Sequence, residues 1–178
     1  MLTATYSIVA LKLEQSRARW TFSSIQQYIL NSIHNIKSAG GIDFEGMLNR
    51  LAQFEQTCHQ RKVEVFVVPA LRRFTHEADA LLDELESLSE ASLALLRSLR
   101  DKLHHALREG AAAIEDICES LEQCCTTLYR RLTREDELVQ IAERAIPSEA
   151  WFGIAADFMS HDAHMTNAMA PVHDDEEE

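Results

Sequence analysis

Two short segments place ionisable side chains at the spacing of one helical turn. The first, HQRKVE, begins at His59, and the second, RLTRED, begins at Arg131. Side chains four residues apart on a helix lie one above the other, so a histidine and a carboxylate at this spacing can bind one metal ion. Here the first pair is His59 with Val63 and the second is Arg131 with Glu135. Each pair therefore keeps only one candidate ligand.

The elements that must position these side chains are helices. The chain of 178 residues contains only five glycines and three prolines, and its long uninterrupted stretches are rich in good helix formers. Helix-breaking residues occur at 39–41, around Pro69, at 109–110 and at 146–147. They divide the chain into four long helical segments and a short fifth. The sequence therefore predicts an all-α protein with the architecture of an up-down four-helix bundle.

Each long segment carries an apolar stripe at helical spacing, and polar side chains interrupt every stripe. In chain order these polar residues are Gln15, Glu55, His59, Ser89, Ser92, Arg131 and Glu135. We therefore expect several polar groups to point toward the interior.

The C-terminal part is predicted to contain a short helix followed by a tail. Trp151, Ile154 and Phe158 share one helical face and are expected to cover one end of the bundle. The bundle is predicted to span residues 1–160. Residues 161–178 contain few large apolar side chains and end in five acids, so we expect a disordered acidic tail.

Three segments carry a resemblance to a known family. They are HQRKVEVFVVPAL, EADALLDELESLSEASLALLRSL and REDELVQIAERAIPSEAWFGIAADF. From about residue 8 to residue 158 the chain resembles the hemerythrin-like, or HHE cation-binding, family of four-helix bundles. The resemblance implies a non-haem di-iron centre, held by histidines from four helices and by carboxylates, that serves oxygen or nitric oxide chemistry or iron sensing.

This chain departs from the family at most of the implied ligand positions. The residues at those positions, in chain order, are Gln15, His59, Val63, Ser89, Arg131 and Glu135. Of the family's own ligand types only His59 and Glu135 remain, and a guanidinium is a donor that stays protonated, so Arg131 cannot bind a metal. We expect Arg131 to bind Glu135 and to supply the positive charge itself, with Gln15, His59 and Ser89 nearby in a buried polar cluster.

The resulting hypothesis is a non-catalytic protein with a binding, sensing or scaffolding role and no cofactor. The first alternative is a di-iron protein with an unusual ligand set that uses Glu55, Glu64 or the histidines near the C-terminus. The second is a histidine phosphotransfer-like signalling bundle, against which an inward-facing His59 would count. A simpler interpretation of His59 is a histidine at the edge of the core, paired with Glu55 or Arg131.

Composition limits the possible partners. A formal net charge of −12 argues against nucleic acid or an anionic membrane as a partner. No apolar run is long enough for a membrane span and no basic residue precedes the first apolar stretch, so we expect a cytoplasmic protein. The partner is expected to be another protein or a second copy. Four cysteines without a metal-site or disulfide pattern are expected to be reduced: Cys58, Cys118, Cys124 and Cys125.

Overall fold

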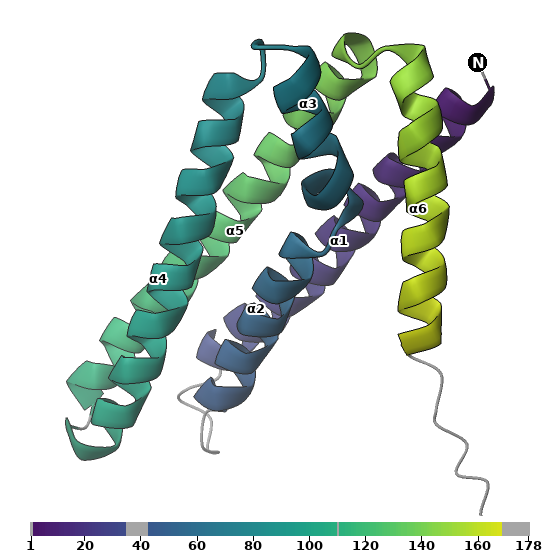
Figure 1. Ribbon diagram of the computed structural model, residues 1–178. Helices are drawn as coiled ribbons and strands as arrows, with labels where there is room; N and C mark the ends of the chain where they lie inside the picture. Colours follow the sequence, from purple (N-terminus) through teal and green to yellow (C-terminus); the bar gives the residue numbers. More distant parts are fainter. Residues whose placement is uncertain (1, 35–42, 110, 169–178) are drawn as a thin grey trace, which may run out of the picture.

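The computed structural model describes residues 2–34, 43–109 and 111–168, and nearly all of them are helical (Figure 1). The elements in chain order are α1 (Leu2–His34), α2 (Phe44–His59), the π-helical turn η2 (Val63–Val67), α3 (Val68–Phe74), α4 (Asp79–Glu109), α5 (Ala111–Ala145) and α6 (Ser148–Ala168). The all-α class is confirmed, with no strand among these residues. No helix in them is long and apolar enough to cross a membrane.

Ion pairs between neighbouring helices show how the chain folds back on itself. Helix α5 runs antiparallel to α4, because Glu84 binds Arg134 near one end of the pair and Lys102 binds Asp116 near the other, at 3.0 and 2.8 Å. Helix α1 packs on both α5 and α6, and α2 lies between α1 and α4. Each of α1, α2 and α4 is therefore a neighbour of the next long helix, whereas α6 packs on α1, as Figure 1 shows.

The apolar interior is divided into two clusters along the length of the helices. One cluster is built around Phe22, Leu51 and Leu121, and the other around Leu11, Leu138 and Trp151. On α1, α4 and α5 the polar residues of the apolar stripe fall at the boundary between the segments that feed these two clusters, and on α2 Glu55 lies near the end of the segment that feeds the first. The structure therefore places a polar layer across the middle of an otherwise apolar core.

The second predicted helical segment is interrupted earlier than expected. The prediction placed the break around Pro69, but α2 ends at His59 and Pro69 lies in the first turn of α3. Proline is tolerated there because the first turn of a helix does not use its backbone N–H groups. The expected break at residues 39–41 lies outside the described residues.

The C-terminal helix is longer than predicted. Trp151, Ile154 and Phe158 are buried in the core cluster around Leu138, as expected. However, α6 continues to Ala168, beyond the boundary predicted at residue 160. Just beyond that point His161 packs edge-on against Phe66, at 5.6 Å between ring centroids. Residues 169–178 of the predicted acidic tail lie outside the described residues.

Candidate functional site: a buried arginine–carboxylate cluster

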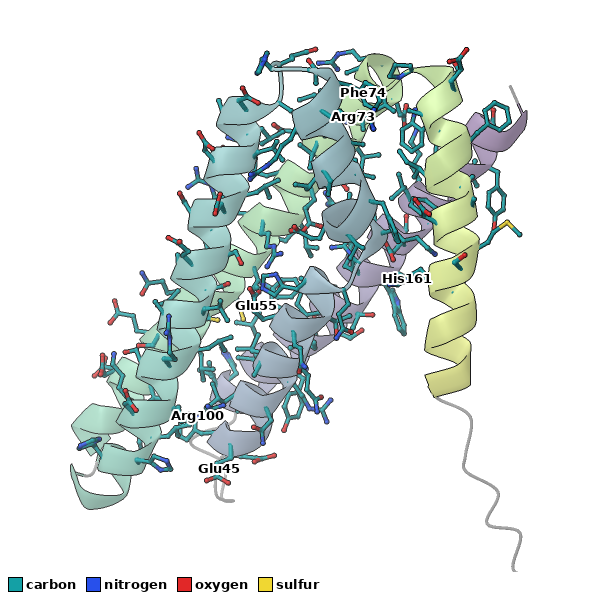
Figure 2. The ribbon with its side chains drawn as sticks, viewed as in Figure 1. Glu45, Glu55, Arg73, Phe74, Arg100 and His161 are labelled. Atoms are coloured by element: carbon teal, nitrogen blue, oxygen red, sulfur yellow. The ribbon has the colours of Figure 1, made fainter. Side chains whose placement is uncertain are left out.

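Arg131 of α5 occupies the centre of the polar layer and is only 1% exposed. Its guanidinium donates to three carboxylates from three different elements. Nη1 donates to Glu55 of α2 and Nη2 to Glu64 of η2, both at 2.8 Å, and Nε donates to Glu135 one turn further along α5 at 3.2 Å. Figure 2 shows Glu55 directed between the helices in the middle of the molecule. The positive charge of Arg131 is therefore enclosed by oxygen atoms that could otherwise bind a cation.

A second arginine, Arg61, completes the cluster from the opposite side. Its side chain is 5% exposed; Nη1 donates to Oε2 of Glu135 and Nη2 to Oε1 of Gln15. Gln15, itself buried, thus connects α1 to the cluster. Arg61 lies outside the residues that the sequence predicted for this site.

The interruption after α2 is what brings Arg61 inside. In an uninterrupted helix His59 would follow Glu55 on the inner face, whereas here the chain turns after His59 and Arg61 points inward. The backbone N–H of Lys62 is bound by the carboxylate of Glu14 on α1, at 3.0 and 3.4 Å to its two oxygens. Burial raises the pKa of Glu14, an effect that Arg61 and Lys62 oppose. Glu14 therefore holds this turn against α1, although burying its carboxylate has a desolvation cost.

His59 does not point inward as expected, because its side chain is 46% exposed. Its Nε2 lies 3.4 Å from Oε1 of Glu55 and 3.4 Å from Oγ of Ser89, so it touches the edge of the cluster. Ser89 of α4 is also 3.4 Å from the same Glu55 oxygen. The expectation of an inward-facing His59 is therefore not met, whereas the simpler interpretation, a histidine at the edge of the core beside Glu55, agrees with this geometry. Ser89 lies at the same rim.

The charges in the cluster nearly cancel. Two guanidinium groups face three carboxyl groups, those of Glu55, Glu64 and Glu135. Burial raises the pKa of the Glu135 carboxyl above its ordinary value, while Arg61 and Arg131 oppose this rise. Glu64 is a quarter exposed, so one of the three carboxylates still reaches solvent.

Not every polar atom in the cluster is satisfied. Within the described part of the chain, Nε2 of Gln15, Oε2 of Glu55 and Nε of Arg61 are buried without a hydrogen-bond partner. Each such atom costs about 1–3 kcal/mol of desolvation. Buried ion pairs contribute little net stability in general, so the cluster is not explained by stability alone.

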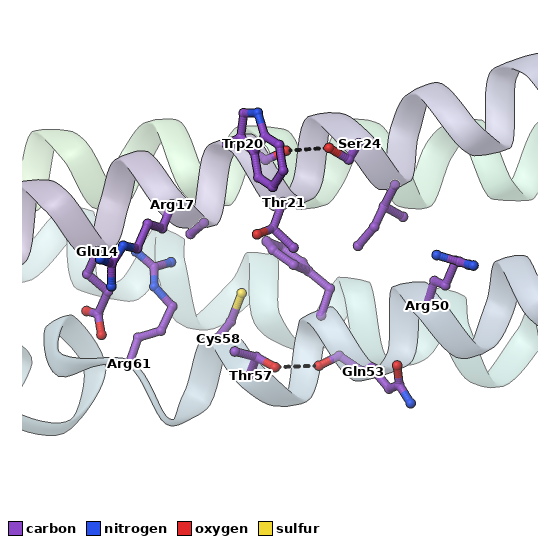
Figure 3. A pocket seen from close by; sticks show the side chains of 13 residues that line it. Glu14, Arg17, Trp20, Thr21, Ser24, Arg50, Gln53, Thr57, Cys58 and Arg61 are labelled. Carbon is purple, nitrogen blue, oxygen red and sulfur yellow. Dashed lines mark hydrogen bonds between the residues drawn. The ribbon is translucent and has the colours of Figure 1, made fainter. Parts of the chain in front are cut away.

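Two cavities approach the cluster from opposite sides. One, of about 560 Å³, lies between α1 and α2 and reaches Arg61; Figure 3 shows Glu14 and Arg17 beside Arg61 at one end and Arg50 at the other. The second, of about 350 Å³, is lined by residues of η2, α3, α4 and α5 and reaches Arg131. A small anion entering either cavity would approach a buried guanidinium.

No metal-binding arrangement is apparent in the described residues. Among these residues, no three or more His, Cys, Asp or Glu side chains are grouped so that they could hold a metal ion. The three carboxylates around Arg131 are each bound to a guanidinium nitrogen instead. No family model, curated protein or solved structure matches the chain. The resemblance to hemerythrin-like proteins therefore continues to depend on the sequence motifs alone.

The cysteines lie away from any redox arrangement. All four are free, and burial raises the pKa of Cys58 and of Cys124 to about 12 and that of Cys125 to about 11. Such thiols are largely protonated at neutral pH and react slowly. They act as small apolar groups of the core.

Proposed function

We propose that this chain is a hemerythrin-like protein, an up-down four-helix bundle, in which an arginine–carboxylate cluster replaces the di-iron centre. The observation that carries the proposal is the position of Arg131, buried and bound to Glu55, Glu64 and Glu135. A guanidinium at that position neutralises carboxylates that would otherwise favour a metal cation, and it cannot itself be a ligand. On this proposal the protein has no metal-dependent catalysis.

The role that follows is binding, sensing or scaffolding in the cytoplasm. The two cavities support a binding role, because each connects solvent to one of the buried arginines. If an anion displaced a carboxylate from Arg61 or Arg131, the contacts among α1, η2 and α5 would change together. Such coupling between a small ligand and helix packing is what a sensor requires.

The deciding experiment is a metal analysis of purified protein after anaerobic incubation with ferrous iron and desalting. We expect far less than one iron per chain and no absorption from oxo-bridged iron. About two irons per chain, the content of a di-metal bundle site, would overturn the proposal. Glu135→Gln is the matched control: if iron were bound at the ligand position that the resemblance implies for Glu135, this variant would lose it.

The first alternative is a metalloprotein with an unusual ligand set. Its supporting observation is that Glu55, Glu64 and Glu135, from three elements, each bind a different nitrogen of the Arg131 guanidinium, with His59 at the rim. A metal could bind there only if the Arg131 side chain moved away. Iron that binds the wild type and depends on Glu55 and Glu64 would favour this alternative.

The second alternative is phosphotransfer through His59. The exposure of its ring removes the objection that an inward-facing histidine could not reach a partner protein. A phosphoryl group on His59 would appear as an acid-labile phosphate after incubation with a phosphorylated signalling protein or acetyl phosphate. Its absence from wild type, or its persistence in His59→Gln, would exclude this role.

A further inference from the structure

The outward face of α1 exposes several large apolar side chains in the described structure, and those of its N-terminal half line a cavity beside His161 and Asp162 of α6. The large apolar side chains that α1 exposes are Tyr6 at 54%, Val9 at 58%, Leu13 at 51%, Trp20 at 75% and Leu30 at 44%. The opposite face of the same helix carries Leu11, Phe22 and Ile29, which are buried in the core. Helices that are apolar on both sides are normally buried on both sides.

The exposed apolar residues follow the repeat of a coiled coil. Tyr6, Leu13 and Trp20 are each separated by seven residues and occupy one position of the heptad, called a. Val9 and Leu30 fall in the same frame at the other seam position, d, with Ser16 and Ser23 at d between them and Gln27 at the next a position. A repeat of seven residues drifts slowly around a straight helix. It keeps facing one partner over several turns only when that partner is a second helix and the two wind around each other. The spacing therefore identifies the occupant of this face as an α-helix.

We propose that the helix covering this face is α1 of a second copy of the chain, packed antiparallel along the seam. An antiparallel pair places each a residue opposite a d residue of the partner. With the two-fold axis near residue 18, Trp20 lies opposite Ser16 of the partner subunit and Leu13 opposite Ser23 of the partner subunit. In these two central layers large side chains face small ones, as close packing between helices requires. In the outer layers Tyr6 lies opposite Leu30 of the partner subunit and Val9 opposite Gln27 of the partner subunit.

A parallel pair fits the same residues poorly. It would stack Trp20 on the partner's Trp20 and Leu13 on the partner's Leu13, while Ser16 and Ser23 would meet their own copies. The Trp20 layer would then be overfilled and the two serine layers hollow, and both defects destabilise an interface. The distribution of large and small residues along the seam therefore favours the antiparallel orientation.

The charges beside the seam make this a salt-dependent contact. Arg17 lies beside the seam near the two-fold axis, where it would face the partner's Arg17. Arg19 is the corresponding residue on the other side, but Asp136 of its own chain neutralises it. We therefore expect the dimer to tighten as ionic strength rises, and Arg17→Gln to tighten it at low salt.

The test measures the mass of the full chain by sedimentation velocity or light scattering across the micromolar range. Wild type is expected to dimerise, and Leu13→Glu and Trp20→Glu are each expected to raise the dimer dissociation constant about tenfold or more. Leu93→Glu is the matched control, because Leu93 is 40% exposed on α4, away from the seam. Circular dichroism checks that the variants stay folded, which exposed positions should permit. A wild type that stays monomeric throughout, or a dimer that survives both seam variants, would overturn the proposal.

Cross-linking tests the orientation in a Cys118→Ser background. The pair Leu13→Cys with Ser23→Cys should form disulfides between chains, because these positions face each other in the antiparallel seam. They lie about 15 Å apart within one helix, too far for a disulfide inside the chain. Ser23→Cys alone should not cross-link; efficient dimers from that single variant would show a parallel pair and refute the proposed arrangement.

Discussion

Arg61 and Arg131 bind the two oxygens of one carboxylate, that of Glu135, from opposite sides. Arg131 comes from the same helix as Glu135, one turn away, whereas Arg61 comes from the turn between α2 and η2. The carboxylate of Glu135 thus connects a contact within α5 to a contact with a segment distant in the sequence. Its position between two apolar clusters means that a change in any of the three residues alters the packing of several helices.

Replacing Arg131 by methionine should destabilise the protein in a pH-dependent way. The variant keeps most of the side-chain volume but leaves three carboxylates without their central cation, which costs about 3–5 kcal/mol near neutral pH. Loss of Arg131 also raises the pKa of Glu135 further, because Arg131 opposes the rise caused by burial.

The sign of the pH effect follows from that raised pKa. A carboxyl group with a raised pKa in the folded state binds its proton more tightly when folded than when unfolded. Its contribution to stability is therefore full below the unfolded pKa of about 4.3 and is lost as pH rises through the folded pKa. Urea unfolding at pH 5 and pH 7.5 should show a larger cost of Arg131→Met at the higher pH. Arg97→Met, at an exposed arginine of α4, is the control, and an equal cost at both pH values would contradict the prediction.

Arg61 and Glu135 should be strongly coupled. Each of Arg61→Met and Glu135→Gln leaves a charged partner behind, so the double variant should cost less than the sum of the two single variants. The coupling energy from urea unfolding is expected in the upper part of the range of about 0.5–3 kcal/mol found for contacting residues. The exposed pair of Arg134 and Glu137 provides a control cycle, for which about 0.5 kcal/mol is expected. Additive effects at Arg61 and Glu135 would mean that their contact is energetically unimportant.

The sequence alone was sufficient to predict that the protein is all-α and which side chains form the inner face of most helices. The stripe of the last long segment, from Ile117 through Arg131 and Glu135 to Ala142, is buried throughout. Simple periodicity works there because α5 is regular from Ala111 to Ala145. Helical periodicity is a local property, so it can be read from one segment without knowledge of the rest.

Helical periodicity gave a wrong prediction at the end of α2. It placed His59 on the inner face and did not identify Arg61 as a buried residue. No glycine or proline marks this turn. The contacts that hold it come from residues distant in the chain: Glu14 accepts from the backbone N–H of Lys62, and Glu135 forms an ion pair with Arg61. One signal was present in the sequence. Glu55 and Glu135 were both expected on inner faces with only Arg131 to balance them, and buried carboxylates in excess require another cation. Arg61, three residues after the buried Cys58, was the available candidate.

His59 should contribute little to stability. Its ring is 46% exposed and touches the cluster only at 3.4 Å, so His59→Gln is expected to change the free energy of unfolding by about 0.5 kcal/mol or less. Glu55→Gln, one turn earlier on α2 and 1% exposed, provides the contrast, because it removes a carboxylate bound to Arg131. Its expected cost is about 3 kcal/mol. Similar effects of the two substitutions in chemical denaturation would place His59 inside the cluster after all.

Thiol labelling should divide the four cysteines by burial. Cys58, Cys124 and Cys125 are buried and their pKa values are raised to about 12, 12 and 11, so the thiolate that reacts with alkylating reagents is scarce near pH 8. Burial and the nearby Glu122 and Glu115 raise the pKa of Cys118 as well. Because Cys118 is only partly buried, however, a short pulse of iodoacetamide on the folded protein should label it first. Mass spectrometry should find one modified cysteine before unfolding and four after it. Cys118→Ser should abolish the early product. Rapid labelling of Cys58 in the folded state would instead show that the turn after α2, and with it the Arg61 contact, opens readily.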